Sequence, residues 1–180
     1  MRWQVGTPLT SVSVVDVNKH TGCVVSDGEL ACLIRDGSHA PTDRIADTVA
    51  STPGATTNEA RPVLLGDAPL GDITDMCMTE DAVCVLVYEN EPPTQGGHSV
   101  YCWGAMAAMP FLASGSAEEG NFTLMNTPEA ITTLPVEITA LECGAQHACV
   151  LDQAGQAYCW GSSSAGQLGQ AAHPGVATTA

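Results

Sequence analysis

The stretch that decides the fold is PEAITTLPVEITALECGAQHACVLDQAGQAYCWGSSSAGQLGQ, residues 128–170. Within it, residues 138–143 alternate apolar and polar side chains, residues 148–151 form a second apolar run, and a third run ends at Trp160. The segment DQAG, residues 152–155, separates the second and third runs and has the composition of a hairpin turn. The stretch therefore predicts three short antiparallel strands followed by a glycine-rich segment.

The same pattern occurs twice more, nearer the N-terminus. Cys23, Cys84 and Cys149 occupy one position of the pattern and are 61 and 65 residues apart in turn. In this frame ITDMCMTEDAVCVL (73–86) aligns without a gap with ITALECGAQHACVL (138–151). Internal copies at such a period indicate a repeat architecture in which each unit packs on its neighbours.

Short strands that recur in this way are typical of antiparallel propeller blades and not of βαβ units. The fold class predicted is all-β, a partial β-propeller of three antiparallel blades with long loop insertions. Each blade corresponds to one repeat, and the inserts have loop compositions. The predicted repeats are 2–61 with an insert at 36–60, 62–127 with inserts at 88–98 and 105–127, and 128–172, followed by 173–180 as the start of a truncated further repeat or a tail.

The charge narrows the range of partners. Lys and Arg total 5 against 20 Asp and Glu, a formal net charge of −15. Such a surface repels phosphate backbones and anionic membranes, so the sequence disfavours nucleic-acid binding. No stretch approaches the roughly 18 apolar residues of a membrane span.

Eight cysteines are more than a reduced cytosolic domain of this size usually carries. They predict disulfides, and hence a secreted, cell-surface or periplasmic protein. The N-terminal segment MRWQVGTPLTSVSVVDV lacks the basic, apolar and small-residue regions of a signal peptide. Either the export signal lies outside this chain or the thiols stay reduced.

The cysteine positions suggest their partners. Three pairs flank predicted hairpins and can therefore lie opposite each other on neighbouring strands. The remaining two align if one residue is inserted in the following turn, and they could bridge neighbouring blades. The hairpin candidates are Cys23 with Cys32, Cys84 with Cys102 and Cys149 with Cys159, and the less certain pair is Cys77 with Cys143.

The third copy resembles the repeat of the regulator of chromosome condensation family. The second copy keeps Tyr101-Cys102-Trp103-Gly104 but lacks the closing Gly-Gln-Leu-Gly, and the first has Leu33 in place of the tryptophan. The resemblance implies seven four-stranded blades, so three copies would need further blades or another subunit to close a ring. It also implies a packing role for the signature residues Trp103, Gly104, His147, Gly155, Trp160, Gly161, Leu168 and Gly169.

Three chemical alternatives compete with this structural interpretation: a zinc site, a general base and a serine nucleophile. Cys143, His147, Cys149 and Cys159 include zinc-ligand types, but their spacing is not that of a zinc knuckle and the other copies do not reproduce it. His147 as a general base and the serines at 162–164 as nucleophiles lack partners in any recognisable motif. Asn121 begins a glycosylation sequon. The sequence predicts no catalytic residue, no metal site and no cofactor.

The sequence therefore favours a non-catalytic module that binds a protein, of unknown identity, through its loops. Members of the family that this chain resembles act as exchange factors, chromatin binders or secreted enzyme inhibitors, which implies protein contacts on a propeller face. The rival hypotheses are a propeller-based enzyme that acts on an extracellular polymer, and a truncated piece with no function of its own.

Overall fold

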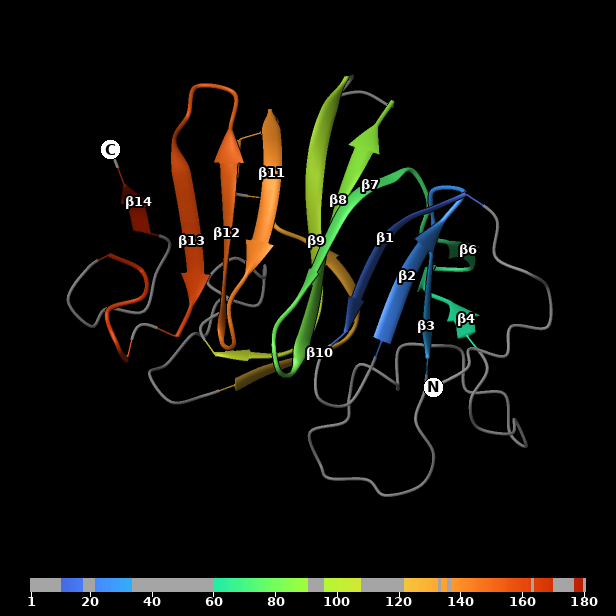
Figure 1. The fold of residues 1–180 in the computed structure, drawn as a ribbon, viewed down its shortest axis with the longest axis horizontal. Coiled ribbons are helices and arrows are strands. Elements are labelled where there is room, and N and C mark those ends of the chain that lie inside the picture. Colours follow the sequence, from blue (N-terminus) through green and yellow to red (C-terminus); the bar gives the residue numbers. More distant parts are fainter. Residues whose placement is uncertain are drawn as a thin grey trace.

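The computed structural model describes residues 11–17, 22–33, 60–90, 96–107, 122–132, 134–135, 137–162, 164–169 and 177–179. Within these ranges the regular elements are all β-strands, which lie in three four-stranded antiparallel sheets and one two-stranded ribbon (Figure 1). The described part of the chain contains no helix that could cross a membrane. The chain is therefore a partial β-propeller of three blades.

In each of the three blades the strands run in chain order from the innermost to the outermost. Blade 1 has β1 (Val12–Val17), β2 (Gly22–Ser26), β3 (Glu29–Leu33) and β4 (Ala60–Pro62). Blade 2 has β7 (Ile73–Met78), β8 (Ala82–Glu89), β9 (Gly97–Ala107) and β10 (Phe122–Ala130). Blade 3 has β11 (Ile138–Cys143), β12 (His147–Asp152), β13 (Ala157–Gly161) and β14 (Ala177–Thr179). The ribbon pairs β5 (Leu64–Leu65) with β6 (Ala68–Pro69).

Sequence repeats and structural blades are out of phase by one strand. In blades 1 and 2 the fourth strand contains the first residue of the next sequence repeat: Pro62 lies in β4, and Pro128 lies in β10. In the same way β14 pairs with β13, so residues 177–179 complete blade 3. A repeat that begins with the last strand of the preceding blade ties neighbouring blades together through the covalent chain.

The inserts are shorter than the sequence indicated. Residues 105–107 and 122–127 belong to β9 and β10, and residues 88–89 and 97–98 belong to β8 and β9. The rest of the 105–127 insert, most of the 36–60 insert and the tip at 91–95 lie outside the described residues.

The three innermost strands share a bulge at the same position, between Val12 and Val14, Ile73 and Asp75, and Ile138 and Ala140. A bulge adds one residue to a strand and so shifts which side chains share a face. Because of it, the first and fourth residues of the innermost strand both face the preceding blade in blades 2 and 3. In blade 2 these are Ile73 and Met76, which are 5% and 4% exposed.

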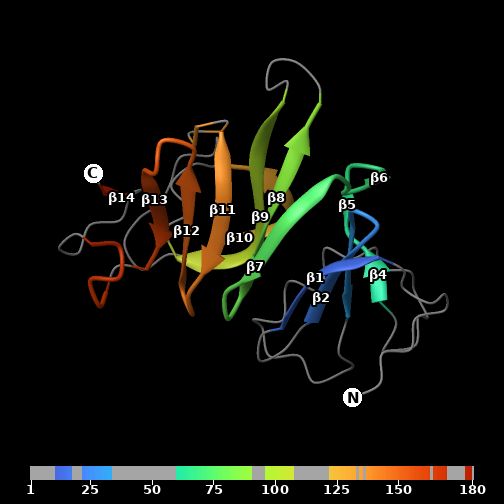
Figure 2. The same cartoon turned by 45° about the horizontal axis from the view of Figure 1, so that its top comes forward.

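The core lies between the blades. β1 packs beside β7, and β7 packs beside β11, as Figure 2 shows. Buried side chains from all three sheets form one continuous cluster, which includes Val25, Leu86, Trp103 and Trp160. Since this core forms only where two sheets face each other, each blade depends on its neighbours for burial.

Candidate functional site

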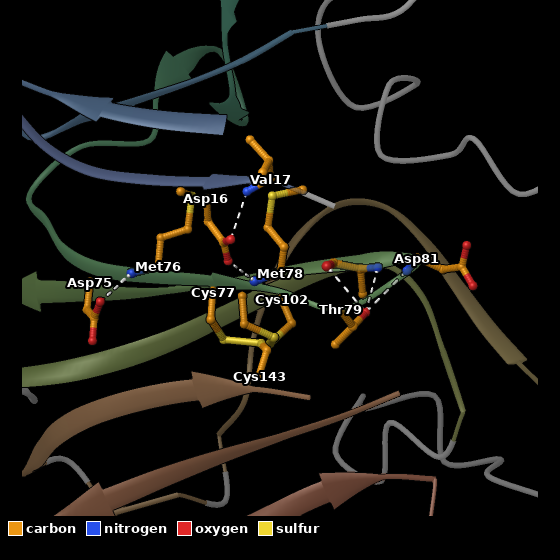
Figure 3. The surroundings of a disulfide bond; sticks show 12 residues. Asp16, Val17, Asp75, Met76, Cys77, Met78, Thr79, Asp81, Cys102 and Cys143 are labelled. Carbon is orange, nitrogen blue, oxygen red and sulfur yellow. Dashed lines mark hydrogen bonds between the residues drawn. A yellow bond between two sulfur atoms is a disulfide. The ribbon is translucent and has the colours of Figure 1, made fainter. Parts of the chain in front are cut away.

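The structure joins all eight cysteines in four disulfides, and the pairs are those that the sequence suggested. Three of them link residues that are directly opposite on the second and third strands of a blade, with Cα atoms 4.1–4.2 Å apart. The fourth joins Cys77 of β7 to Cys143 of β11 and so links blade 2 to blade 3 (Figure 3).

The expected alignment of Cys77 with Cys143 is wrong. Cys77 lies opposite Cys84, whereas the residue opposite the equivalent Cys149 is Glu142. Cys77 therefore corresponds to Glu142, and Cys143 corresponds to Met78. Adjacent residues of a strand point to opposite faces of the sheet. Cys77 points from β7 toward blade 3, and Cys143, one repeat position later, points from β11 back toward blade 2, so the two can meet. Two residues at the same position would point the same way and could not meet.

A second link between blades was missed by the sequence analysis. Asp16, which occupies the Cys77 position in blade 1, accepts a hydrogen bond from the Met78 backbone N–H at 2.8 Å and another from the Val17 N–H at 2.7 Å. Figure 3 shows this carboxylate on one side of β7 and the Cys77–Cys143 bridge on the other. A single acidic residue in a degenerate repeat gives no sequence signal for such a contact. The same repeat position thus joins each blade to the next.

The signature tryptophans lie between blades. Trp103 and Trp160 are 0% exposed, and the indole N–H of each has no hydrogen-bond partner among the described groups. Each is followed by a glycine with positive φ, 103° at Gly104 and 113° at Gly161. A Cβ on Gly161 would overlap the backbone at His147, and one on Gly104 would overlap Ala82. The Trp-Gly pair therefore lets the inner end of the third strand approach its neighbour closely.

The remaining signature residues also have structural positions. His147 begins β12, and its imidazole lies over Gly144, where a Cβ would overlap the ring. Gly155 has a φ of 80° in the β12–β13 turn. Leu168 is 2% exposed and packs against Cys159, and Gly169 donates its N–H to the Gly166 carbonyl at 2.9 Å. The closing Gly-Gln-Leu-Gly thus folds back over the outer disulfide of blade 3.

The zinc alternative is wrong for this structure. Its three cysteines are oxidised in two different disulfides, and a disulfide sulfur is not the thiolate that zinc binds. Elsewhere within the described ranges, His, Cys, Asp and Glu side chains form no group of three able to hold a metal ion. Asn121 lies outside the described residues.

The most distinctive surface feature is the β8–β9 hairpin. β8 and β9 contain 8 and 11 residues, against 6 and 5 in the equivalent β12 and β13. In Figure 2 this end of the pair reaches farther than the ends of β11 and β12. On it, Tyr88 is 36% exposed and lies edge-on to the half-buried His98, with ring centroids 5.4 Å apart.

The base of this hairpin is held by a tyrosine–carboxylate pair. The Tyr101 hydroxyl donates to Glu89 at 3.1 Å across the two strands. Burial raises the pKa of Tyr101, and the charge of Glu89 and the hydrogen bond to it raise that pKa further. Because a raised phenol pKa means that the folded state holds its proton more tightly, stability falls as the pH rises from about 10 through the folded-state pKa.

We expect Glu89→Gln to lower the Tyr101 pKa without restoring the ordinary value, because burial is the larger cause. The measurement is the ultraviolet absorption of tyrosinate during an alkaline titration, with Tyr101→Phe used to assign the signal. Asp152→Asn is the matched control, since Asp152 accepts from Tyr158 at 3.3 Å in blade 3 and should change only that tyrosine. A Tyr101 titration unchanged by Glu89→Gln would contradict the pair.

Stacked antiparallel blades bridged within and between sheets define a disulfide-linked partial β-propeller. Residues 138–167 match the model of the regulator of chromosome condensation (RCC1) repeat, so this segment is a repeat of the family that the sequence resembled. The match contains β11, β12 and β13 and ends beside Leu168.

Solved structures have the same fold. Human WBSCR16 is 17% identical, with a TM-score of 0.57 over 84% of this chain and 33% of that chain. A chain in the structure of Kap60 bound to yeast RCC1 (Prp20) is 15% identical, with a TM-score of 0.56 over 85% of this chain and 32% of that one. Prp20p from Saccharomyces cerevisiae is 15% identical, with a TM-score of 0.54 over 84% of this chain and 33% of its own. The chain thus spans about a third of the length of these structures. No curated protein matches it in sequence.

Proposed function

We propose that this chain is a non-catalytic propeller module that binds another protein through the β8–β9 hairpin. The observation that carries the proposal is the exposed Tyr88, held against His98 on strands longer than their counterparts. Tyrosine is a frequent energetic anchor in protein interfaces, and enlarged hairpins on rigid scaffolds are common recognition elements.

The partner that this surface favours is a protein with a basic binding face. The net charge of −15 would accelerate association with a cationic surface and repel nucleic acid. Prp20p, which has a similar fold, is described together with its binding properties to Gsp1p and histones. That precedent supports a protein-binding role for the present propeller.

The compartment that we propose is an oxidising one, outside the cell or in the periplasm. All eight cysteines are paired, and none is available as a free thiol for catalysis or metal binding. Stable disulfides at this density are typical of exported proteins.

The test is affinity capture with chemical cross-linking, comparing the chain with its Tyr88→Ala variant. Leu65→Ala is the matched control, because Leu65 is also exposed, at 41%, but lies in the β5–β6 ribbon. We expect Tyr88→Ala to weaken capture of the specific partner at least about tenfold, which corresponds to about 1.4 kcal/mol, and Leu65→Ala to leave capture unchanged.

Equal capture by both variants would contradict the hairpin assignment. The enzyme alternative is tested in the same samples by incubation with polysaccharides: release of oligosaccharides by the chain, abolished by a single substitution, would overturn the non-catalytic proposal.

A further inference from the structure

The β8–β9 hairpin has two sides, and one of them is turned toward blade 3. Cys77 lies opposite Cys84 on the neighbouring strand and forms a disulfide with blade 3, so these two cysteines mark the side of the sheet that blade 3 covers. Alternate residues of a strand share a side, which places Leu86 and Tyr88 on that same side. His98 is the residue opposite Tyr88, so the aromatic pair is turned toward blade 3.

Blade 3 covers this side of the hairpin only up to its own end. Leu86 is 3% exposed, whereas Tyr88, two residues farther along β8, is 36% exposed. Figure 2 shows the hairpin continuing beyond the end of β11, the innermost strand of blade 3. Tyr88 and His98 therefore form a wall that rises above the end of blade 3, at an internal junction of the chain.

The entry of blade 3 lies at the foot of this wall. Glu137 directly precedes β11, as Asp72 directly precedes β7 in blade 2. At the junction of blades 1 and 2 the short β2–β3 turn rests on the equivalent entry, where the Gly28 carbonyl accepts the Ile73 N–H at 3.0 Å. Gly28 follows the residue at the repeat position of Tyr88, so the same stacking brings the level of Tyr88 to the entry of blade 3. The β8–β9 hairpin continues past that level, and Glu137 is exposed.

Blades 2 and 3 contain no basic side chain. Residues 62–180 include 13 Asp and Glu and no Lys or Arg. The carboxylates of these blades therefore cannot pair with a cation from the same blades, and their charge attracts cationic groups from outside. Glu137 is one of these carboxylates, and it is the one at the foot of the aromatic wall.

We propose that Tyr88, His98 and Glu137 form a binding site for an arginine side chain of a partner protein. This inference rests on the proposed function, in which the same hairpin contacts a protein with a basic face, and it names the group that is recognised. A guanidinium group is planar, so it can lie flat on an aromatic ring while its N–H groups donate to a carboxylate. The Tyr88 ring supplies the aromatic face, His98 supports that ring edge-on, and Glu137 supplies the acceptor.

The aromatic half of the site is tested by calorimetric titration with acetylated hexa-arginine and hexalysine amides, at an ionic strength of about 0.15 M. We expect hexa-arginine to bind more tightly, because the two peptides carry the same charge and only the guanidinium group stacks and forks. Tyr88→Leu keeps an apolar side chain without a π system and should raise the dissociation constant for hexa-arginine about fivefold. Tyr88→Phe keeps the ring and should leave that constant unchanged.

The carboxylate half is tested with Glu137→Gln, which should also raise the dissociation constant for hexa-arginine about fivefold. The matched control is Glu129→Gln, which removes one exposed carboxylate from β10, the outermost strand of blade 2, and should change that constant less than about twofold. In the double variant Tyr88→Leu/Glu137→Gln the loss should be smaller than the product of the two single losses, since both residues contact one guanidinium group.

Three results would overturn the arginine site: equal affinity for the two peptides, equal effects of Glu137→Gln and Glu129→Gln, or full affinity in Tyr88→Leu. The same variants separate this inference from the proposed function. Capture of a protein partner that depends on Tyr88 and not on Glu137 would leave the hairpin function standing and overturn the arginine site. Capture that does not depend on Tyr88, with hexa-arginine binding that depends on both residues, would support the site and overturn the hairpin function alone.

Discussion

Replacing Trp160 by alanine is expected to lower the free energy of unfolding by about 3–5 kcal/mol. The side chain is 0% exposed and lies on the face of blade 3 that packs against blade 2, the face that Cys143 shares, so its removal opens a cavity between blades 2 and 3. Urea or guanidinium denaturation, without reductant, measures the change.

Trp160→Phe should cost less than Trp160→Ala, because the ring partly fills the space and the lost indole N–H has no described hydrogen-bond partner. Leu151→Ala is the control in the neighbouring strand: its side chain is 41% exposed, so the change should stay within about 1 kcal/mol. Similar losses for Trp160→Ala and Leu151→Ala would mean that the blades do not pack through the tryptophan.

Removing the interblade bridge with Cys77→Ala/Cys143→Ala is expected to cost about 4 kcal/mol, the largest effect of any disulfide here. The loss arises mainly in the unfolded state, because this bridge closes the longest loop, with a sequence separation of 66 residues. The matched control is Cys149→Ala/Cys159→Ala, which opens a separation of 10 residues and should cost about 3 kcal/mol.

The two double variants are expected to differ in which part of the fold they loosen, as well as in the size of the stability loss. Loss of Cys77–Cys143 leaves blades 2 and 3 joined by the covalent chain, by packing and by contacts such as the hydrogen bond from the Glu80 N–H to the Ala145 carbonyl, 2.8 Å long. We therefore expect hydrogen exchange in blade 3 to become faster than in blade 2, and intact mass to show three remaining bridges. A smaller cost than that of the hairpin bridge, or uniform exchange across both blades, would contradict the linking role.

The repeat frame was readable from the sequence because its signals are local. Cys149 and Cys159 flank a short turn, and a hairpin brings residues at such positions opposite each other whatever the rest of the chain does. The Trp-Gly ending is local too, since Gly161 is needed for a φ of 113° and a close approach to the adjacent strand. Strand type, hairpin bridges and core tryptophans follow from such near-neighbour constraints.

Contacts between residues far apart in the sequence were harder to predict. The expected alignment of Cys77 with Cys143 failed because it ignored that residues meeting between stacked sheets must point in opposite directions. The hydrogen bond from Met78 to Asp16 joins residues 62 apart and depends on how one blade stands against the next. The longer strands of the β8–β9 hairpin were read as a loop because Tyr88 and Glu89 precede a segment of turn composition.

The sequence by itself determined that this chain is built of cysteine-bridged, antiparallel repeats, because hydrophobic alternation and turn chemistry act over a few neighbouring residues. Only the tertiary structure decided which face of each blade meets the next, and therefore that Asp16, Cys77 and Glu142 are one linking position. The physical reason is that the burial of a repeat residue depends on a neighbouring sheet: Leu86 and Leu151 have the same local sequence position, and the presence of another blade alone makes one of them core and the other surface.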